Sequence, residues 1–135
     1  MKMLQHSRSS VLLFITMLAL AGCQSINPMS IAETPAQKAY ALERSYNIVL
    51  AGALDLVNDP AVPAGVKSNI RSVERRTTPI VDNLSQAFAD YTVARAALSS
   101  GTGSQERIEV IAANLEGWIK QAERAIVELA NAVDR

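Results

Sequence analysis

The chain has 135 residues, of which 49% are hydrophobic and 4% aromatic, and its 13 basic and 13 acidic side chains balance. This length fits one modest domain, and the neutral charge argues against a nucleic-acid-binding or polybasic membrane-binding protein. The single histidine, His6, and the single cysteine, Cys23, both lie near the N-terminus. Residues 24–135 therefore hold no Cys/His zinc site, no Ser-His-Asp or Cys-His nucleophile and no histidine acid–base. We expect a non-enzymatic protein without a metal or cofactor.

The first 22 residues have the pattern of a secretory signal. Lys2 and Arg8 precede an apolar run from Val11 to Leu20, and no acidic residue occurs before Glu33. An apolar run of about ten residues is too short to span a bilayer as a helix. We therefore expect residues 1–22 to be a cleaved signal peptide, after which 11 basic side chains accompany 13 acidic ones.

The end of this segment, Leu20-Ala21-Gly22-Cys23, resembles the lipobox of bacterial lipoproteins. In that family the cysteine thiol receives a diacylglycerol, the chain is cut just before the cysteine, and the new amine is acylated, for example with palmitate. The resemblance implies lipidation of Cys23, cleavage between Gly22 and Cys23, and membrane lipid as a partner. The residue after the cysteine, Gln24, implies the outer membrane facing the periplasm. The alternatives are an ordinary cleaved signal or a retained anchor helix, with Cys23 incidental.

Residues 23–33 show no sustained period and contain Pro28, so we interpret them as the lipidated cysteine and a short tether. A first helix is predicted over 34–58, because Thr34 can cap it, Pro35 suits its first position and Gln37 can complete a capping box. Apolar residues then recur at helical spacing. Gly52 inside this helix predicts a close approach of another helix.

Residues 63–99 form the longest periodic segment, with apolar residues on both sides of Pro79 at alternating spacings of four and three. Proline in a helix interior removes one backbone hydrogen bond and crowds the preceding turn, which costs about 3 kcal/mol. Because the heptad phase continues through Pro79 without a shift, we predict one long helix that is kinked there. The alternative is a break at Thr77-Thr78.

A loop rich in serine and glycine, residues 99–104, precedes a third helix predicted over 104–133. No segment shows the alternation of a strand. Three amphipathic helices joined by short loops predict an all-α, elongated antiparallel three-helix bundle. The second and third helices should form a hairpin, with the shorter first helix covering part of it. An uncovered groove is then the expected place for a partner.

Four basic side chains on the second helix form a basic ridge: Lys67, Arg71, Arg75 and Arg76. The ridge could meet lipid phosphates, lipopolysaccharide or an acidic partner. A solvated face is the other interpretation, in which the ridge pairs with acids brought by the neighbouring helices, namely Asp55, Asp59, Glu123, Glu128 and Asp134.

Trp118 lies on the apolar face predicted for the third helix, so it either packs in the core or anchors an interface. Tyr40 and Tyr46 are expected in the core or at its boundary, and the alternative is that they face a ligand or the membrane. Glutamates on the third helix lie among basic residues, which indicates a solvent face: Glu106, Glu109, Glu116 and Glu123. An enzyme that uses only carboxylates would need Glu116 and a second acid converging in a cleft.

The segment from Thr34 to Glu43, followed by Tyr46, is similar to the opening of small helical proteins of proteobacteria and their tailed phages or prophages. This resemblance implies no activity, only a connection with phages. We expect a lipid-anchored periplasmic module that binds or scaffolds another envelope protein, or itself, through helix faces. The alternative is a phage-derived envelope effector, either a lysis component or a superinfection-exclusion lipoprotein that blocks a receptor.

Overall fold

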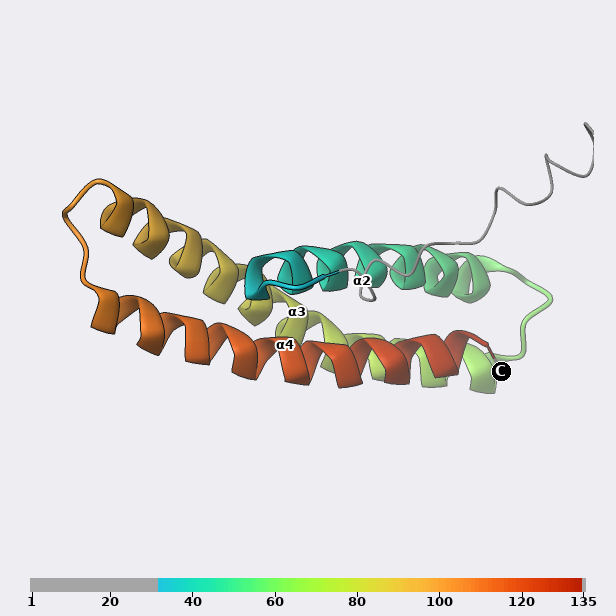
Figure 1. Ribbon diagram of the computed structural model, residues 1–135. Coiled ribbons are helices and arrows are strands. Elements are labelled where there is room, and N and C mark those ends of the chain that lie inside the picture. Colours follow the sequence, from blue (N-terminus) through green and yellow to red (C-terminus); the bar gives the residue numbers. More distant parts are fainter. Residues whose placement is uncertain (1–31, 135) are drawn as a thin grey trace, which may run out of the picture. The chain divides into compact units, whose positions relative to one another are not determined.

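The computed structural model describes residues 32–134. These residues form three helices, which are α2 (Pro35–Asn58), α3 (Ala64–Ser99) and α4 (Gln105–Val133), and no strand occurs among them (Figure 1). The predicted all-α three-helix bundle is confirmed. Lipidation of Cys23 and cleavage between Gly22 and Cys23 concern positions outside the described residues, so both stay predictions. Among the described helices, none has the length and apolar character that crossing a membrane requires.

The three helices run antiparallel, as expected, and α3 and α4 form a hairpin (Figure 1). Helices of 24, 36 and 29 residues have lengths of about 36, 54 and 44 Å at 1.5 Å per residue. α2 is the shortest and begins partway along the hairpin, so it leaves the end of the hairpin around residues 99–104 without a third helix (Figure 1).

The core is built mainly from aliphatic side chains and alanines. Its largest fully buried side chains are Ile70, Thr77, Leu84, Leu115 and Leu129, and Ala39 and Ala122 are also completely buried. Tyr46 is the largest side chain of α2 in the core, and its hydroxyl lies 2.7 Å from Thr78 Oγ1 on α3. Small side chains at the helix contacts let the backbones approach closely, so the bundle is narrow.

The start of α2 has the predicted capping box. Thr34 Oγ1 accepts a hydrogen bond of 3.2 Å from the Gln37 backbone N–H, and Gln37 Oε1 accepts bonds of 3.0 Å from the backbone N–H groups of Glu33 and Thr34. These bonds satisfy N–H groups that have no partner inside the helix. Pro35 at the first helical position needs no such partner. The helix therefore begins at a well-defined residue directly after the expected tether.

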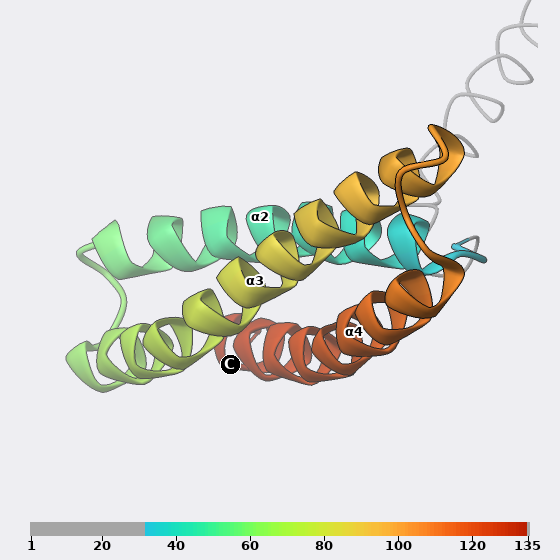
Figure 2. The ribbon, with the colours of Figure 1, turned by 90° about the vertical axis from the view of Figure 1, so that its left-hand side faces the viewer.

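α3 continues through Pro79 as one helix, so the predicted single helix is confirmed and the alternative break at Thr77-Thr78 is wrong. The helix changes direction about midway along its length (Figure 2). Pro79 has no N–H for the carbonyl one turn before it. Thr77 Oγ1 lies 3.0 Å from Val73 O and Thr78 Oγ1 lies 3.1 Å from Glu74 O, and such back-bonding also bends helices.

Gly52 lies beside the end of α4, as its position predicted, but the contact does not require a glycine. A Cβ at Gly52 would lie 3.6 Å from Val133 Cγ1, an ordinary van der Waals distance. Gly52→Ala should therefore raise the free energy of unfolding by about 0.5–1 kcal/mol, because alanine loses less backbone entropy in a helix. Urea unfolding followed by circular dichroism measures the change.

Gly103→Ala is the matched control for this substitution. A Cβ at Gly103 would lie 2.7 Å from the backbone nitrogen of Leu98, so this change should destabilise the protein. Equal effects of the two substitutions would contradict the packing described at Gly52.

Candidate functional site

The uncovered end of the hairpin is shaped by a tightly folded loop. Gly101 has a φ of 76°, which glycine adopts without strain. The backbone N–H groups of Thr102 and Gly103 both donate to the carbonyl of Ala97 over 2.9 Å, and the N–H of Gly101 donates to Leu98. These bonds satisfy carbonyls at the end of α3 that lack helical partners. The loop is therefore fixed to the helix that precedes it.

The loop hydroxyls take part in the same caps. Ser99 Oγ donates to Ala96 O over 2.8 Å, and Thr102 Oγ1 donates to Ala97 O over 3.2 Å. Ser104 Oγ accepts a 3.3 Å bond from the Arg107 backbone N–H and caps α4. These hydroxyls therefore stabilise the end of α3 and the start of α4.

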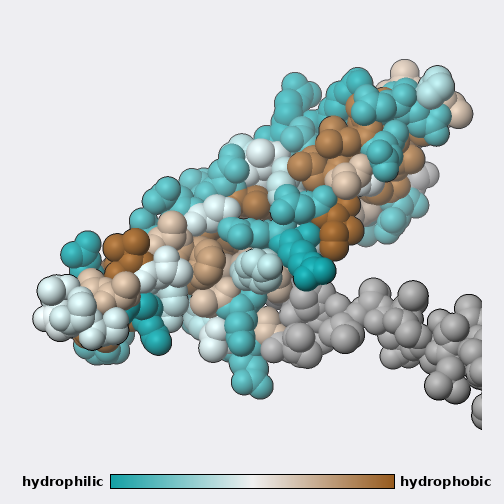
Figure 3. Space-filling view, turned by 90° about the horizontal axis from the view of Figure 1, so that it is seen from above, coloured by the Kyte–Doolittle hydropathy of each residue, from teal (hydrophilic) through white to brown (hydrophobic). Residues whose placement is uncertain are grey.

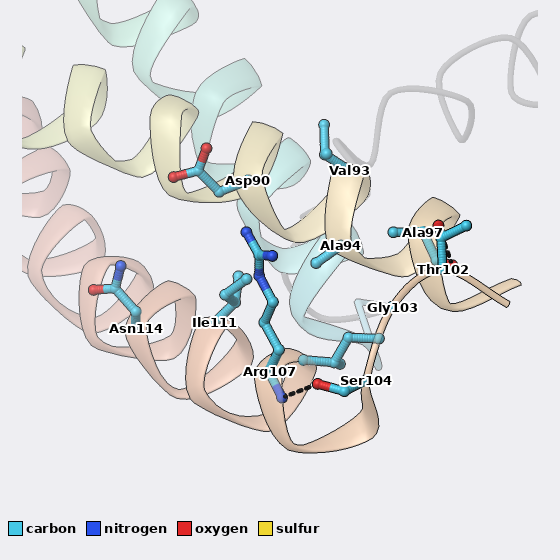
Figure 4. A pocket seen from close by; sticks show the side chains of 11 residues that line it. Asp90, Val93, Ala94, Ala97, Thr102, Gly103, Ser104, Arg107, Ile111 and Asn114 are labelled. Carbon is cyan, nitrogen blue, oxygen red and sulfur yellow. Dashed lines mark hydrogen bonds between the residues drawn. The ribbon is translucent and has the colours of Figure 1, made fainter. Parts of the chain in front are cut away.

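Between α3 and α4 at this end lies a groove of about 370 Å³, which we call the tip groove (Figure 4). Apolar side chains from both helices form its floor, among them Ala94, Ala97 and Ile111, and Val93 lies at its edge. Asp90 stands on α3 and Asn114 on α4, and the side chain of Arg107 extends from α4 across the opening toward α3. The predicted uncovered groove is thus placed at the tip of the hairpin, where α2 does not reach.

An apolar floor with an acid, a guanidinium and an amide at its rim can hold a ligand or a partner segment by apolar contact and hydrogen bonds. The volume is within the range of ligand pockets. Asp90 Oδ1 accepts a 3.0 Å hydrogen bond from Gln86 Nε2, so this carboxylate is already oriented along α3. Among residues 32–134, no group of three or more histidine, cysteine, aspartate or glutamate residues is placed to hold a metal ion.

The four residues of the basic ridge differ in their contacts. Arg76 turns toward α4 and forms an ion pair with Glu128 over 2.6 Å, which is one of the acids that the solvated-face interpretation named. Within the described part of the chain, Lys67, Arg71 and Arg75 form no ion pair with an acidic side chain. Arg75 Nε instead donates to Arg71 O over 3.3 Å. An exposed pair such as Arg76–Glu128 stabilises a protein by at most about 1 kcal/mol.

Trp118 is half-buried, so it lies at the boundary of the core rather than inside it, and Leu115 and Ile119 beside it are buried. Four of the five glutamates of α4 were expected on a solvent face, and all four are exposed: Glu106, Glu109, Glu116 and Glu123. Because Glu116 is exposed, the buried pair of acids that a carboxylate enzyme would need is not formed there.

The expectation for Tyr40 was wrong: its side chain is 62% exposed, whereas Tyr46 is buried. Ile48 and Leu54 are also exposed on α2, and sequence reasoning did not single them out. In the sequence, all three lie between the residues of α2 that are buried. Apolar residues at positions that the buried face does not use are the signal that could have identified them. α2 thus presents apolar side chains on the side opposite its packed face.

Compared with known proteins, the chain matches no family model, no curated protein and no solved structure.

Proposed function

We propose that this chain is a non-enzymatic lipoprotein, anchored through Cys23 in the outer membrane and facing the periplasm, whose helical bundle binds another envelope protein in the tip groove. The tip groove is the observation that supports binding most directly. It combines an apolar floor with Asp90, Arg107 and Asn114 at its rim, and such a mixture gives both contact area and orientation to a partner segment. The lipobox-like residues 20–23 support the anchor.

The position of the anchor agrees with this role. Twelve residue steps separate Cys23 from Pro35, the first residue of α2, and an extended chain of that length spans about 40 Å. The bundle would therefore stay within a short distance of the membrane surface. Two or three acyl chains exceed what stable anchoring needs, so the protein would not exchange freely between membranes.

A phage-derived envelope effector is the second candidate, and the resemblance of residues 34–46 to phage and prophage proteins favours it. The two candidates share the anchor and differ in the partner. A housekeeping module would bind a resident envelope protein, whereas an effector would bind a lysis partner in the inner membrane or an outer-membrane receptor. A neighbouring phage lysis or morphogenesis gene would also favour the effector.

The anchor and the groove can be tested together in cells with the tagged full-length protein. A photoreactive amino acid replaces Val93, which is 69% exposed at the groove, or Val127, which is 54% exposed on α4 away from it. We expect one crosslinked protein from position 93 and none from position 127. Cys23→Ala should remove the acyl mass, move the protein out of the outer-membrane fraction and abolish the crosslink.

Each half of the proposal can fail separately. If the Cys23→Ala protein keeps its place in the outer membrane, the anchor is wrong. If positions 93 and 127 give the same products, the tip groove is not the binding site. The mass of the crosslinked partner then distinguishes a resident envelope protein from a phage target.

A further inference from the structure

The side of α2 that faces away from α3 and α4 carries an ordered set of exposed residues, which we call the outward stripe. Tyr40, Ile48 and Leu54 are 62%, 65% and 52% exposed. Arg44, Ala51 and Asp55 lie among them and are also exposed. At 100° per residue these six positions fall within about one third of the helix circumference, opposite most of the buried residues of α2. The buried Ala41 borders this sector beside Ile48, and the exposed Asn47 lies inside it. The stripe therefore has an apolar centre at Ile48 and Ala51, with opposite charges toward its two ends.

This concentration of apolar side chains is specific to α2. Single exposed valines occur elsewhere, Val93 on α3 and Val110 and Val127 on α4, and isolated apolar residues are normal on a surface. Figure 3 looks onto the side on which α2 lies in Figure 1 and shows hydrophobic residues among hydrophilic ones there, with a further hydrophobic group near the left end of the view. A grouped apolar face on one helix indicates a binding surface.

The charges of the stripe indicate the occupant. Arg44 and Asp55 are 11 residues apart, which is about three turns and about 16 Å along the helix. They are too far apart to pair with each other within one chain, and neither forms an ion pair within residues 32–134. A second α2 lying antiparallel on the first brings Arg44 opposite Asp55 of the partner subunit. The two-fold axis repeats this pair, so both charges of both chains are matched.

The same register matches the apolar centre. The antiparallel arrangement that aligns position 44 with position 55 also aligns position 48 with position 51, so it would bring Ile48 and Ala51 of the two copies together. The small alanine allows the two helices to approach closely. A surface that complements itself in this way is the requirement for a two-fold homodimer.

We propose that the outward stripe of α2 is the interface through which two copies of this chain form an antiparallel, two-fold dimer. A membrane surface fits the stripe less well, because Asp55 would face anionic lipid and Arg44 is its one cation. The proposal goes beyond the binding function of the tip groove, which lies on α3 and α4, and it does not depend on the lipid anchor.

The test uses the purified full-length protein in detergent, with Cys23→Ser so that an introduced thiol is the only one. Ala51→Cys places a thiol in the stripe, and Val110→Cys is the control at an exposed position of α4. A bis-maleimide then links thiols that lie near each other. We expect a covalent dimer from Ala51→Cys and little from Val110→Cys.

Exchanging the charges at positions 44 and 55 in the Ala51→Cys variant tests whether the two helices pair in the antiparallel register. Arg44→Glu or Asp55→Arg alone creates two repulsive pairs and should reduce the crosslinked fraction about tenfold or more. The double variant Arg44→Glu/Asp55→Arg reverses both pairs and should restore crosslinking. Rescue cannot arise within one chain, since the two positions are about 16 Å apart.

The interface is supported if the crosslinked dimer is lost in each single variant and recovered in the double variant. Equal crosslinking from Ala51→Cys and Val110→Cys, or failure of the double variant to recover, would overturn it. Circular dichroism of each variant shows whether the helices are intact, and because both charges are exposed we expect unchanged spectra. A negative result here leaves the tip groove and the Cys23 anchor unaffected.

Discussion

Leu84→Ala should lower the free energy of unfolding by about 2–5 kcal/mol, a large part of the stability of a small domain. Leu84 lies in the middle of α3 and has 0% exposure. The substitution removes buried methyl groups and leaves a cavity that helices on both sides cannot fully close. Because the core contains few large side chains, little else can fill the space. Urea unfolding of the full chain, followed by circular dichroism, measures the loss.

Val127→Ala provides the control for this change. It also shortens an aliphatic side chain in a helix interior, but Val127 is 54% exposed and lies outside the outward stripe, so its effect on the unfolding free energy should be within about 0.5 kcal/mol. Comparable losses at the two positions would show that the core is not where the structure places it. A selective loss at position 84 would establish the packing of α3 against its neighbours.

Pro79→Ala should raise the free energy of unfolding by about 1–3 kcal/mol. Pro79 is exposed in the interior of α3, so its ring contributes little to the core. Alanine supplies the missing N–H to the carbonyl of Arg75 and removes the clash with the preceding turn, and alanine is favoured over proline in a helix interior by about 3 kcal/mol. The lower value allows for packing that has adapted to the bend. The same urea titration measures the gain.

Pro63→Ala is the control for this substitution. Pro63 precedes α3 at its N-cap, where no helical hydrogen bond is missing, so its replacement should have little effect or slightly destabilise. If Pro79→Ala destabilises the protein instead, the bend itself is required for α3 to contact both α2 and α4. The hydroxyl of Thr77, which reaches Ala125 O on α4 over 3.3 Å, would then be part of that requirement.

The helices could be predicted from the sequence because local signals mark their ends. Thr34, Pro35 and Gln37 have one favourable arrangement at a helix start, and glycines and serines between positions 99 and 104 leave a turn as the favourable solution. The continuity of α3 followed from the phase of its apolar residues across Pro79. Each of these inferences depends on neighbours in the chain, which the sequence contains directly.

The features that could not be predicted depend on how the helices are placed against one another, both along their axes and around them. The tip groove exists because α2 begins partway along the hairpin, and the sequence does not state the axial offset between helices. The basic ridge divides because Arg76 is one residue, or about 100°, around the helix from Arg75, which turns it toward Glu128. The exposure of Tyr40 likewise follows from which side of α2 meets the other helices.

The completely buried alanines have a consequence for how this sequence can change over evolution. Ala39 and Ala122 are in full contact with neighbouring helices. Each is already near the smallest residue that a helix favours, so few substitutions can leave a large void there. Enlargement, in contrast, would push whole helices apart, because close-packed interiors do not absorb added volume. We therefore expect selection to remove substitutions that enlarge these two side chains, which preserves the narrow separation of the helices.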